Sequence, residues 1–207
     1  MAAQTDSRET HFYLKLFVKS SIFIFAAAII SKLFSYGYKI IIARSFGAET
    51  YGLFSLAIIL ISIASSVATL GLYDGLVRFI SFYRGKHAFG KIRRLVLSSQ
   101  TIFIATGLIF TVLLIFFAPY IGDKLFHTDK FTPLLIGMTL ALPFLLLANL
   151  FLGVLRGFER IKTYSALINI YQNTARFIIL GLLVLIGAGA IAISISYVVV
   201  FIGLFLI

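Results

Sequence analysis

The apolar residues of this 207-residue chain form long continuous runs that are separated by short polar segments. A helix that crosses a bilayer needs about 20 mostly apolar residues. We expect such helices over residues 18–43, 51–79, 95–118, 133–155, 164–186 and 188–207. A transmembrane β-barrel would instead show segments of about ten residues with alternating hydrophobicity. The pattern therefore predicts an all-α integral membrane protein, built as a six-helix transmembrane bundle.

The three prolines refine the expected helix boundaries. Pro119 is expected to end the third helix, because proline lacks the N–H group that a helix interior requires. Pro133 suits the first turn of the fourth helix, and Pro143 predicts a kink within that helix.

Small residues recur at helical spacing in two of the expected helices. Gly71 and Gly75, like Gly153 and Gly157, have the GxxxG spacing that allows close helix packing, although glycine is common in membrane helices generally. Hydroxyl residues of the second expected helix also fall near one face and are typical of close packing: Ser55, Ser62, Ser66, Thr69 and Tyr73.

Residues 1–17 precede the first apolar run, and we expect them to form an amphipathic cytoplasmic tail before a membrane unit over 18–207. Two lysines followed by the apolar run 22–30 superficially resemble a signal peptide. The apolar pattern resumes after Lys32, however, which argues against cleavage. At the other end the last run is still apolar at Ile207, so we expect the chain to be truncated at its carboxyl end.

Composition supports the membrane assignment. Hydrophobic residues make up 61% of the chain, more than a soluble domain of this length can bury. The chain has no cysteine, which excludes disulfides and thiolate metal sites, and we expect no metal or other cofactor. The net charge of +11 would suggest nucleic acid as the partner of a soluble protein, but membrane proteins collect cations in their cytoplasmic loops. We therefore expect no nucleic-acid partner.

The distribution of cations predicts the orientation in the cytoplasmic membrane. With a cytoplasmic amino terminus, the outer segments hold three cations, Arg44, Lys124 and Lys130. The inner segments then hold twelve: Arg8, Lys15, Lys19, Arg78, Arg84, Lys86, Lys91, Arg93, Arg94, Arg156, Arg160 and Lys162. This bias places the amino terminus inside. The most basic loop, 81–94, can be interpreted either as a topology signal alone or as a contact for anionic lipid headgroups.

Three cations lie inside the expected helices. Lys32, Tyr36 and Lys39 have i, i+4, i+7 spacing and so share one face of the first helix. A lysine near mid-bilayer costs about 2.5–3.5 kcal/mol on insertion scales and usually faces a bundle interior or a hydrated cavity. Lys39 lies about 10 Å further along the helix and could equally extend its ammonium group to the surface.

The fifth expected helix carries a polar stripe that ends in the third cation, Arg176. The stripe consists of Ser165, Asn169, Gln172, Asn173 and Arg176. Hydrogen bonds between helices would account for Asn169 and Gln172. They account less well for Arg176, because no carboxylate is expected at its depth.

The chain has only seven acidic residues, and six of them fall in expected tails or loops. Asp74 alone lies near a helix interior, where Arg78 follows at i+4, and we expect these two to pair as a gate near the cytoplasmic face. Lys32 and Arg176 are then left without an anionic partner in the chain. Such a positive cavity suits an anionic ligand such as a phosphate or pyrophosphate.

Three segments carry a family resemblance: KIIIARSFGAETYGLFSLA (39–57), TLGLYDGLVRFIS (69–81) and LGVLRGFERIKTYS (152–165). They resemble oligosaccharide and polysaccharide flippases (polysaccharide biosynthesis proteins) of the multidrug/oligosaccharidyl-lipid/polysaccharide exporter superfamily, and the resemblance spans roughly residues 15–205. It implies two six-helix lobes around a central cavity, of which this chain is the amino-terminal lobe. A second six-helix lobe is then an expected partner.

The resemblance also implies that basic cavity residues receive the pyrophosphate of a lipid-linked sugar. The expected substrate-binding residues are Lys32, Tyr36, Lys39, Asn169, Asn173 and Arg176. Arg44 matches a recurrent basic residue at the exit of the first helix and could be structural.

The leading hypothesis is therefore a flippase for a polyprenyl-(pyro)phosphate-linked oligosaccharide, working by alternating access. No bond is made or broken, so we expect no catalytic residues; substrate, membrane lipids and a second lobe are the expected partners. A cation-coupled multidrug exporter is an alternative, but it needs carboxylates within the membrane. A polyprenyl-phosphate enzyme is another, but it needs clustered carboxylates or a base–nucleophile pair, and the three histidines lie in separate segments. A structural or regulatory half-protein is a further possibility.

Overall fold

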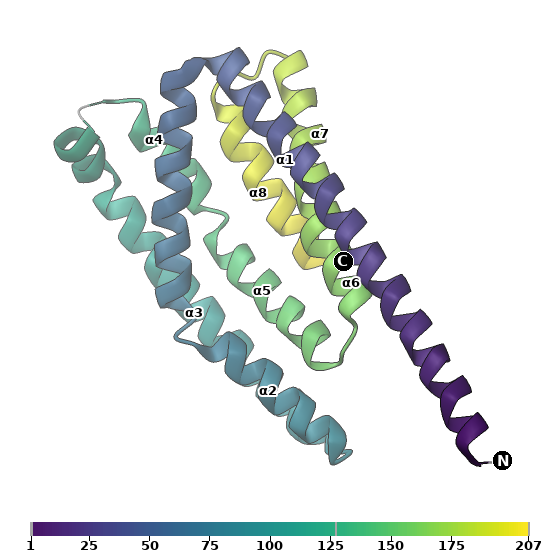
Figure 1. Cartoon of the computed structure of the whole chain (residues 1–207). Helices are drawn as coiled ribbons and strands as arrows, with labels where there is room; N and C mark the ends of the chain where they lie inside the picture. Colours follow the sequence, from purple (N-terminus) through teal and green to yellow (C-terminus); the bar gives the residue numbers. More distant parts are fainter. Residues whose placement is uncertain (1, 127, 207) are drawn as a thin grey trace.

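The computed structural model describes the backbone of residues 2–126 and 128–206, and the side chains of residues 22, 24–124, 126 and 128–206. This part of the chain is helical and contains no strand, so the all-α prediction is confirmed (Figure 1). The α-helices are α1 Ala2–Ala68, α2 Leu72–Gly85, α3 Phe89–Ile121, α4 Phe131–Thr139, α5 Leu142–Gly157, α6 Ile161–Ser165, α7 Gln172–Leu185 and α8 Ile191–Leu206. Two π-helical segments, η1 Gly122–Phe126 and η2 Ala166–Tyr171, follow α3 and α6.

The longest helix, α1, turns back on itself at Gly47. This residue has φ 87° and ψ 163°, a conformation that glycine adopts without the steric penalty of a side chain. Residues 2–46 form the first arm and residues 48–68 the second arm, which run in opposite directions in Figure 1. The first two expected helices are thus joined by one non-helical residue, and the segment 1–17 expected as a tail is helical from Ala2 onward.

Two of the expected helices are interrupted. The second, over 51–79, breaks between α1 and α2, where Leu70 and Gly71 have φ values of 49° and 70°. The fourth, over 133–155, divides into α4 and α5, which meet at 41°. This bend lies where Pro143 predicts it, because Pro143 cannot donate a hydrogen bond to the carbonyl of the residue four positions earlier.

The third helix is longer than expected. Pro119 lies inside α3, which continues to Ile121 instead of ending at residue 118. The helix continues because proline removes only its own hydrogen bond: the N–H of Gly122 still bonds to the carbonyl of Ala118. The fifth expected helix is found as the continuous segment Ile161–Leu185, which includes η2.

The number of membrane spans differs from the expected six. By length and hydropathy, Ile24–Ala68, Phe89–Lys124 and Ile161–Leu185 could each cross a membrane, and the bent pair α4 and α5 would make a fourth span. The six-helix count is therefore not confirmed. The difference has two causes: the candidate Ile24–Ala68 contains the bend at Gly47, and α8, with 16 residues, is shorter than the about 20 that a span needs.

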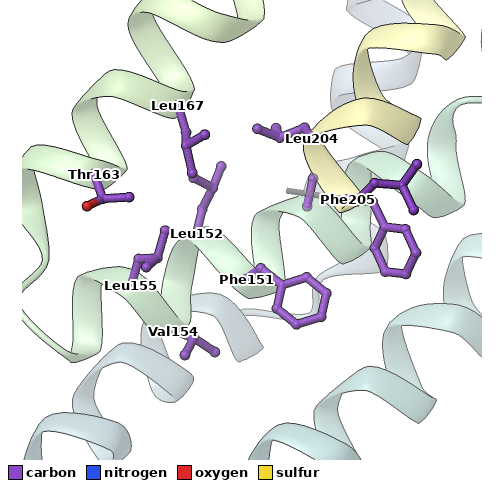
Figure 2. Close-up of a pocket in the computed structure, with 10 residues that line it drawn as sticks. Phe151, Leu152, Val154, Leu155, Thr163, Leu167, Leu204 and Phe205 are labelled. Carbon is purple, nitrogen blue, oxygen red and sulfur yellow. The ribbon is translucent and has the colours of Figure 1, made fainter.

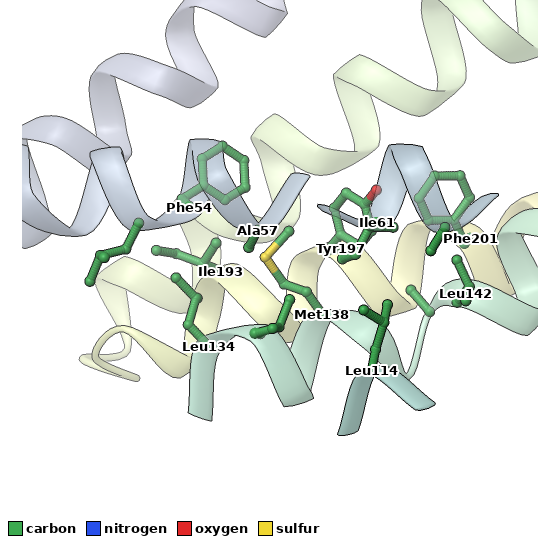
Figure 3. Close-up of a cluster of buried hydrophobic side chains, with 14 of the residues drawn as sticks. Phe54, Ala57, Ile61, Leu114, Leu134, Met138, Leu142, Ile193, Tyr197 and Phe201 are labelled. Atoms are coloured by element: carbon green, nitrogen blue, oxygen red, sulfur yellow. The ribbon is translucent and has the colours of Figure 1, made fainter. Parts of the chain in front are cut away.

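The main core lies where the second arm, α4 and α8 meet (Figure 3). Phe54 and Ile61 of the second arm, Met138 of α4 and Ile193 of α8 are almost completely buried there. Lipid tails are as apolar as these side chains, so close packing stabilises the bundle more than removal from water does.

A second core holds α2 against α3 and α5, around Ile80, Phe103 and Leu150. Gly157 faces α2 so closely that an added Cβ atom would lie 2.7 Å from Ile80 Cγ2, whereas Gly75 has nothing within 4 Å. The GxxxG spacing therefore marks close packing in α5, but not at Gly75.

The connecting segments gather at two ends of the bundle. Figure 1 shows the α2–α3 turn, the α5–α6 turn and the amino-terminal end of α1 toward one end. The bend at Gly47, the segment between α3 and α4 and the α7–α8 turn lie at the other. The segments that were expected to be cytoplasmic thus share one end, while which side of the membrane this end faces stays a prediction.

Candidate functional site

The first arm of α1 has one packed side and one cationic side. Ser31 and Tyr38 are buried on the packed side, where Tyr38 Oη lies 3.3 Å from Ser196 Oγ of α8. Lys32, Tyr36 and Lys39 are all exposed, and the Lys39 ammonium lies 6.0 Å from the centre of the Tyr36 ring. Neither lysine forms an ion pair with any carboxylate whose side chain the structure describes. These three residues, the cationic face, are thus free to meet a ligand or another surface.

Asn169 and Asn173, two expected substrate ligands, are engaged within the bundle. The Asn173 Nδ2 group donates to Ser31 Oγ at 2.7 Å and to the Asn169 carbonyl at 3.4 Å. Asn169 Nδ2 donates to Ser165 Oγ at 3.1 Å. The bond to Ser31 joins α7 to the first arm, whereas the bonds to Asn169 and Ser165 stay within one helical segment. Hydrogen bonding between helices, expected for Asn169 and Gln172, is thus found at Asn173 instead.

Arg176 lies against two aromatic rings of α8. Its guanidinium carbon is 4.6 Å from the centre of the Tyr197 ring and 5.0 Å from that of Phe201, both on α8. With the Gln172 amide oriented to satisfy both of its ends, its oxygen accepts a hydrogen bond from Arg176 Nη2 at 3.1 Å. Ring faces attract cations, so Arg176 is stabilised without a carboxylate. Its Nε is nevertheless buried without a hydrogen-bond partner.

A polar cavity of about 300 Å³ lies between the second arm, α5, α8 and the segment from η2 to α7. Its polar lining consists of Ser62, Ser65, Ser66, Asn149 and Gln172, and we name it the serine cavity. Gln172 and Phe201 both line this cavity and contact Arg176, which places the guanidinium next to it. Hydroxyl and carboxamide groups both donate and accept hydrogen bonds, so the lining suits a hydroxyl-rich ligand.

From the sequence we interpreted Ser62 and Ser66 as residues of close helix packing, whereas both line this cavity. The hydroxyl pattern of the second expected helix included Ser62 and Ser66, but Ser55 instead donates to the Tyr51 carbonyl and Thr69 to the Ser66 carbonyl. Asn149 was missed. The signal was present, because Asn149 is the sole polar residue in the apolar stretch 142–155.

A second pocket, of about 380 Å³, is lined mostly by hydrocarbon side chains (Figure 2). Leu152 and Leu155 of α5, Leu167 of η2 and Phe205 of α8 contribute to it, and Thr163 supplies the one side-chain oxygen among its lining residues. Such a lining is suited to hydrocarbon.

The expected gate pair is not formed. Asp74 and Arg78 are both exposed, and no ion pair joins them. Because α2 begins at Leu72, Asp74 lies in its first turn, where the partial positive charge of the helix end favours a carboxylate without a cationic partner. Arg84 instead pairs with Glu159 at 2.7 Å and ties α2 to the α5–α6 turn.

Comparison with known proteins adds two findings. A family model described as polysaccharide biosynthesis protein matches residues 17–206. Stage V sporulation protein B of Bacillus subtilis (strain 168) is 27% identical over 143 residues, a match that covers 68% of this chain and 27% of the relative's length. No solved structure matches significantly.

Proposed function

Because this chain belongs to the polysaccharide biosynthesis protein family, we propose that it takes part in moving a polyprenyl-(pyro)phosphate-linked saccharide across the cytoplasmic membrane. The observation that carries this proposal is the cationic face of the first arm. It lies within a segment apolar enough to span a membrane, and its two lysines are exposed without a carboxylate partner among the described residues. An ammonium group in such a position is stabilised by water or by an anionic ligand.

Lys32 and Lys39 receive the phosphate groups in this proposal. They are separated by about 10 Å along the helix. One lysine can therefore hold the headgroup, and the other can bind it when the cavity opens toward the opposite side of the membrane. Tyr36 lies between them and supplies a hydroxyl group. A second lobe would cover this face and complete an alternating-access path.

The interior polar groups have a different role in the proposal. Asn173 joins α7 to Ser31 of the first arm, Asn169 bonds to Ser165, and Arg176 is stabilised by the ring faces of Tyr197 and Phe201. We assign sugar hydroxyl groups, rather than phosphate, to the serine cavity. The apolar pocket in Figure 2 is suited to part of the polyprenyl chain.

The alternatives have less support. A cation-coupled drug exporter needs a carboxylate facing a cavity, but neither the serine cavity nor the apolar pocket has one in its lining. An enzyme acting on polyprenyl phosphates needs a base or a nucleophile with a base beside it. The lining residues offer hydroxyl and amide groups instead.

A binding assay tests the proposal. The purified protein in nanodiscs would be titrated with fluorescent polyprenyl pyrophosphate, with phosphate-free polyprenol as the comparison ligand. Lys32→Met should weaken binding about tenfold or more, because a hydrogen bond to a charged group contributes about 1.5–3 kcal/mol. Lys32→Arg should retain part of the affinity.

Lys124→Met serves as the matched control, because Lys124 is an exposed lysine of η1 and lies outside the first arm. It should bind like the wild type. Equal affinity of the wild type for pyrophosphate and polyprenol would contradict the proposed function, and wild-type affinity of Lys32→Met would remove Lys32 from it.

A further inference from the structure

We propose that the α2–α3 hairpin, residues 78–94, binds the headgroups of anionic phospholipids at the membrane surface. We name it the basic hairpin. This site is separate from the cationic face and does not depend on the transport proposal. Its evidence is the charge, the exposed aromatic rings and the rigid attachment of the hairpin to the bundle.

The charge of the basic hairpin is of one sign. Residues 78–94 contain no Asp or Glu, and their cations are Arg78, Arg84, Lys86, Lys91, Arg93 and Arg94. Glu159 pairs with Arg84 at 2.7 Å. The other five cations have no carboxylate partner among the side chains that the structure describes, and all five are exposed. An anionic bilayer surface attracts a segment of this kind.

Aromatic rings lie exposed between these cations. Phe79, Phe82 and Phe89 have 48%, 52% and 56% of their surface exposed. The Lys86 ammonium lies 4.3 Å from the centre of the Phe82 ring, and that of Lys91 lies 5.7 Å from the centre of the Tyr83 ring. Aromatic rings at the boundary of headgroups and acyl chains, with cations reaching the phosphates, are typical of interfacial segments. A signal for topology alone needs the charges but not the rings.

The lengths of the helices bring the hairpin to the membrane surface. With 33 residues, α3 is about 50 Å long, whereas the hydrocarbon core of a bilayer is about 30 Å thick. One end at least must therefore leave the core. The first turns of α3 carry Lys91, Arg93 and Arg94, while its last turns are apolar, so the charged end is the one that extends beyond the hydrocarbon.

The hairpin is fixed to the bundle, so its free side is presented in a defined way. Leu76 and Ile80 bury the opposite side of α2 in the second core. Ser81 Oγ donates to the carbonyl of Gly157 at 3.1 Å. Arg78, Phe82 and Lys86 follow at i, i+4 and i+8 and form one row about 12 Å long. A row of this length matches several neighbouring headgroups better than a single free phosphate ion, which needs converging donors.

Native mass spectrometry of the purified chain can test the proposal. The protein would be equilibrated in mixed micelles with equal amounts of phosphatidylglycerol and phosphatidylcholine, and bound lipids counted. We expect the wild type to retain phosphatidylglycerol several-fold over phosphatidylcholine. Arg93→Gln with Arg94→Gln should clearly lower this ratio, because it removes two of the five exposed cations that have no carboxylate partner among the described side chains.

The matched control is Lys124→Gln with Lys130→Gln, which removes two exposed cations near the other end of the bundle. It should keep the wild-type ratio, because the basic hairpin is unchanged. It should also fold normally, since the exposed pair of Lys130 with Glu49 contributes little to stability. Circular dichroism would verify folding of both double variants. An equal loss of preference in the control, no preference in the wild type, or full displacement of the lipid by millimolar inorganic phosphate would each overturn the proposal.

The rings provide a second readout. Because the chain has no cysteine, His87→Cys gives one labelling site in the turn of the basic hairpin. A fluorophore there should be quenched by brominated phosphatidylglycerol more than by brominated phosphatidylcholine. Phe82→Ala should reduce this quenching about twofold, and an unchanged value would exclude the rings from the site.

Discussion

Among single residues, Arg176 has the most informative surroundings. Its guanidinium group rests against Tyr197 and Phe201 and donates to Gln172, so a cation inside the bundle is stabilised by ring faces and an amide. The count of carboxylates along the sequence led us to expect an anionic ligand there. We did not consider aromatic rings as partners of Arg176, because a sequence does not show which rings from another helix will lie beside a given cation.

A double-mutant cycle on Arg176 and Tyr197 follows from this contact. We expect Arg176→Met and Tyr197→Leu each to destabilise the protein, but together by less than the sum of the two. A coupling of about 1–2 kcal/mol is expected, as for a cation–π pair shielded from water. Unfolding of the detergent-solubilised protein by denaturant would measure it. Strict additivity would show that the ring contact contributes nothing to stability.

At the scale of elements, the packing of α2 on α5 depends on small residues of α5, and the closest contact is at Gly157. Gly157 lies against Ile80 with no room for a side chain, and Ser81 bonds to its carbonyl. Together with the second core, this contact holds the basic hairpin in a fixed position. A larger residue at position 157 would have to push α2 away, at the expense of the second core.

Gly157→Ala should therefore lower the free energy of unfolding by about 1–3 kcal/mol, the usual effect of overpacking a tight contact. Gly181→Ala is the control, because an added Cβ in the middle of α7 would meet nothing within 4 Å. It should be neutral or stabilising by up to about 1 kcal/mol, since alanine favours helix. Equal thermal stability of the two variants would contradict the close contact.

The sequence predicted elements better than their interruptions. Long apolar runs located α3 and α8 to within a few residues, except at the start of α3, six residues earlier than expected. The break at Leu70 and Gly71 was missed because the segment 51–79 was taken as one helix, although both residues adopt positive φ values.

The polar stripe of the fifth expected helix shows the same limit. A 3.6-residue period placed Asn173 and Arg176 close together, and both lie in α7, but a period does not show which helix each side chain will face. Asn173 then bonds to the first arm while Arg176 packs on α8. Spacing was reliable for Lys32, Tyr36 and Lys39, because the first arm is regular α-helix through this region.

At the scale of the whole molecule, the basic turns gather at one end (Figure 1). This end is expected to be cytoplasmic, since cations in short loops determine orientation. The orientation applies to the basic hairpin as well, which would then meet the leaflet that carries anionic lipids.

Single cysteines would test the orientation in cells, because the wild-type chain has none. A cysteine at His87 should be protected from an impermeant thiol reagent added outside, whereas one at Thr128 should react. Labelling after the membrane is permeabilised would confirm that both positions are accessible. The reverse pattern would invert the protein and place the basic hairpin in the outer leaflet.

The bend at Gly47 has a consequence for biosynthesis. Only a single non-helical residue lies between the arms. There is thus no loop that would let the translocon insert one arm into the membrane before the other. We expect the two arms to partition into lipid together as a helical hairpin. The apolar second arm would then offset the insertion penalty of Lys32, about 2.5–3.5 kcal/mol for a lysine at mid-bilayer, and the smaller penalty of Lys39. Two charged residues can thus be kept in the first arm because it does not have to insert by itself.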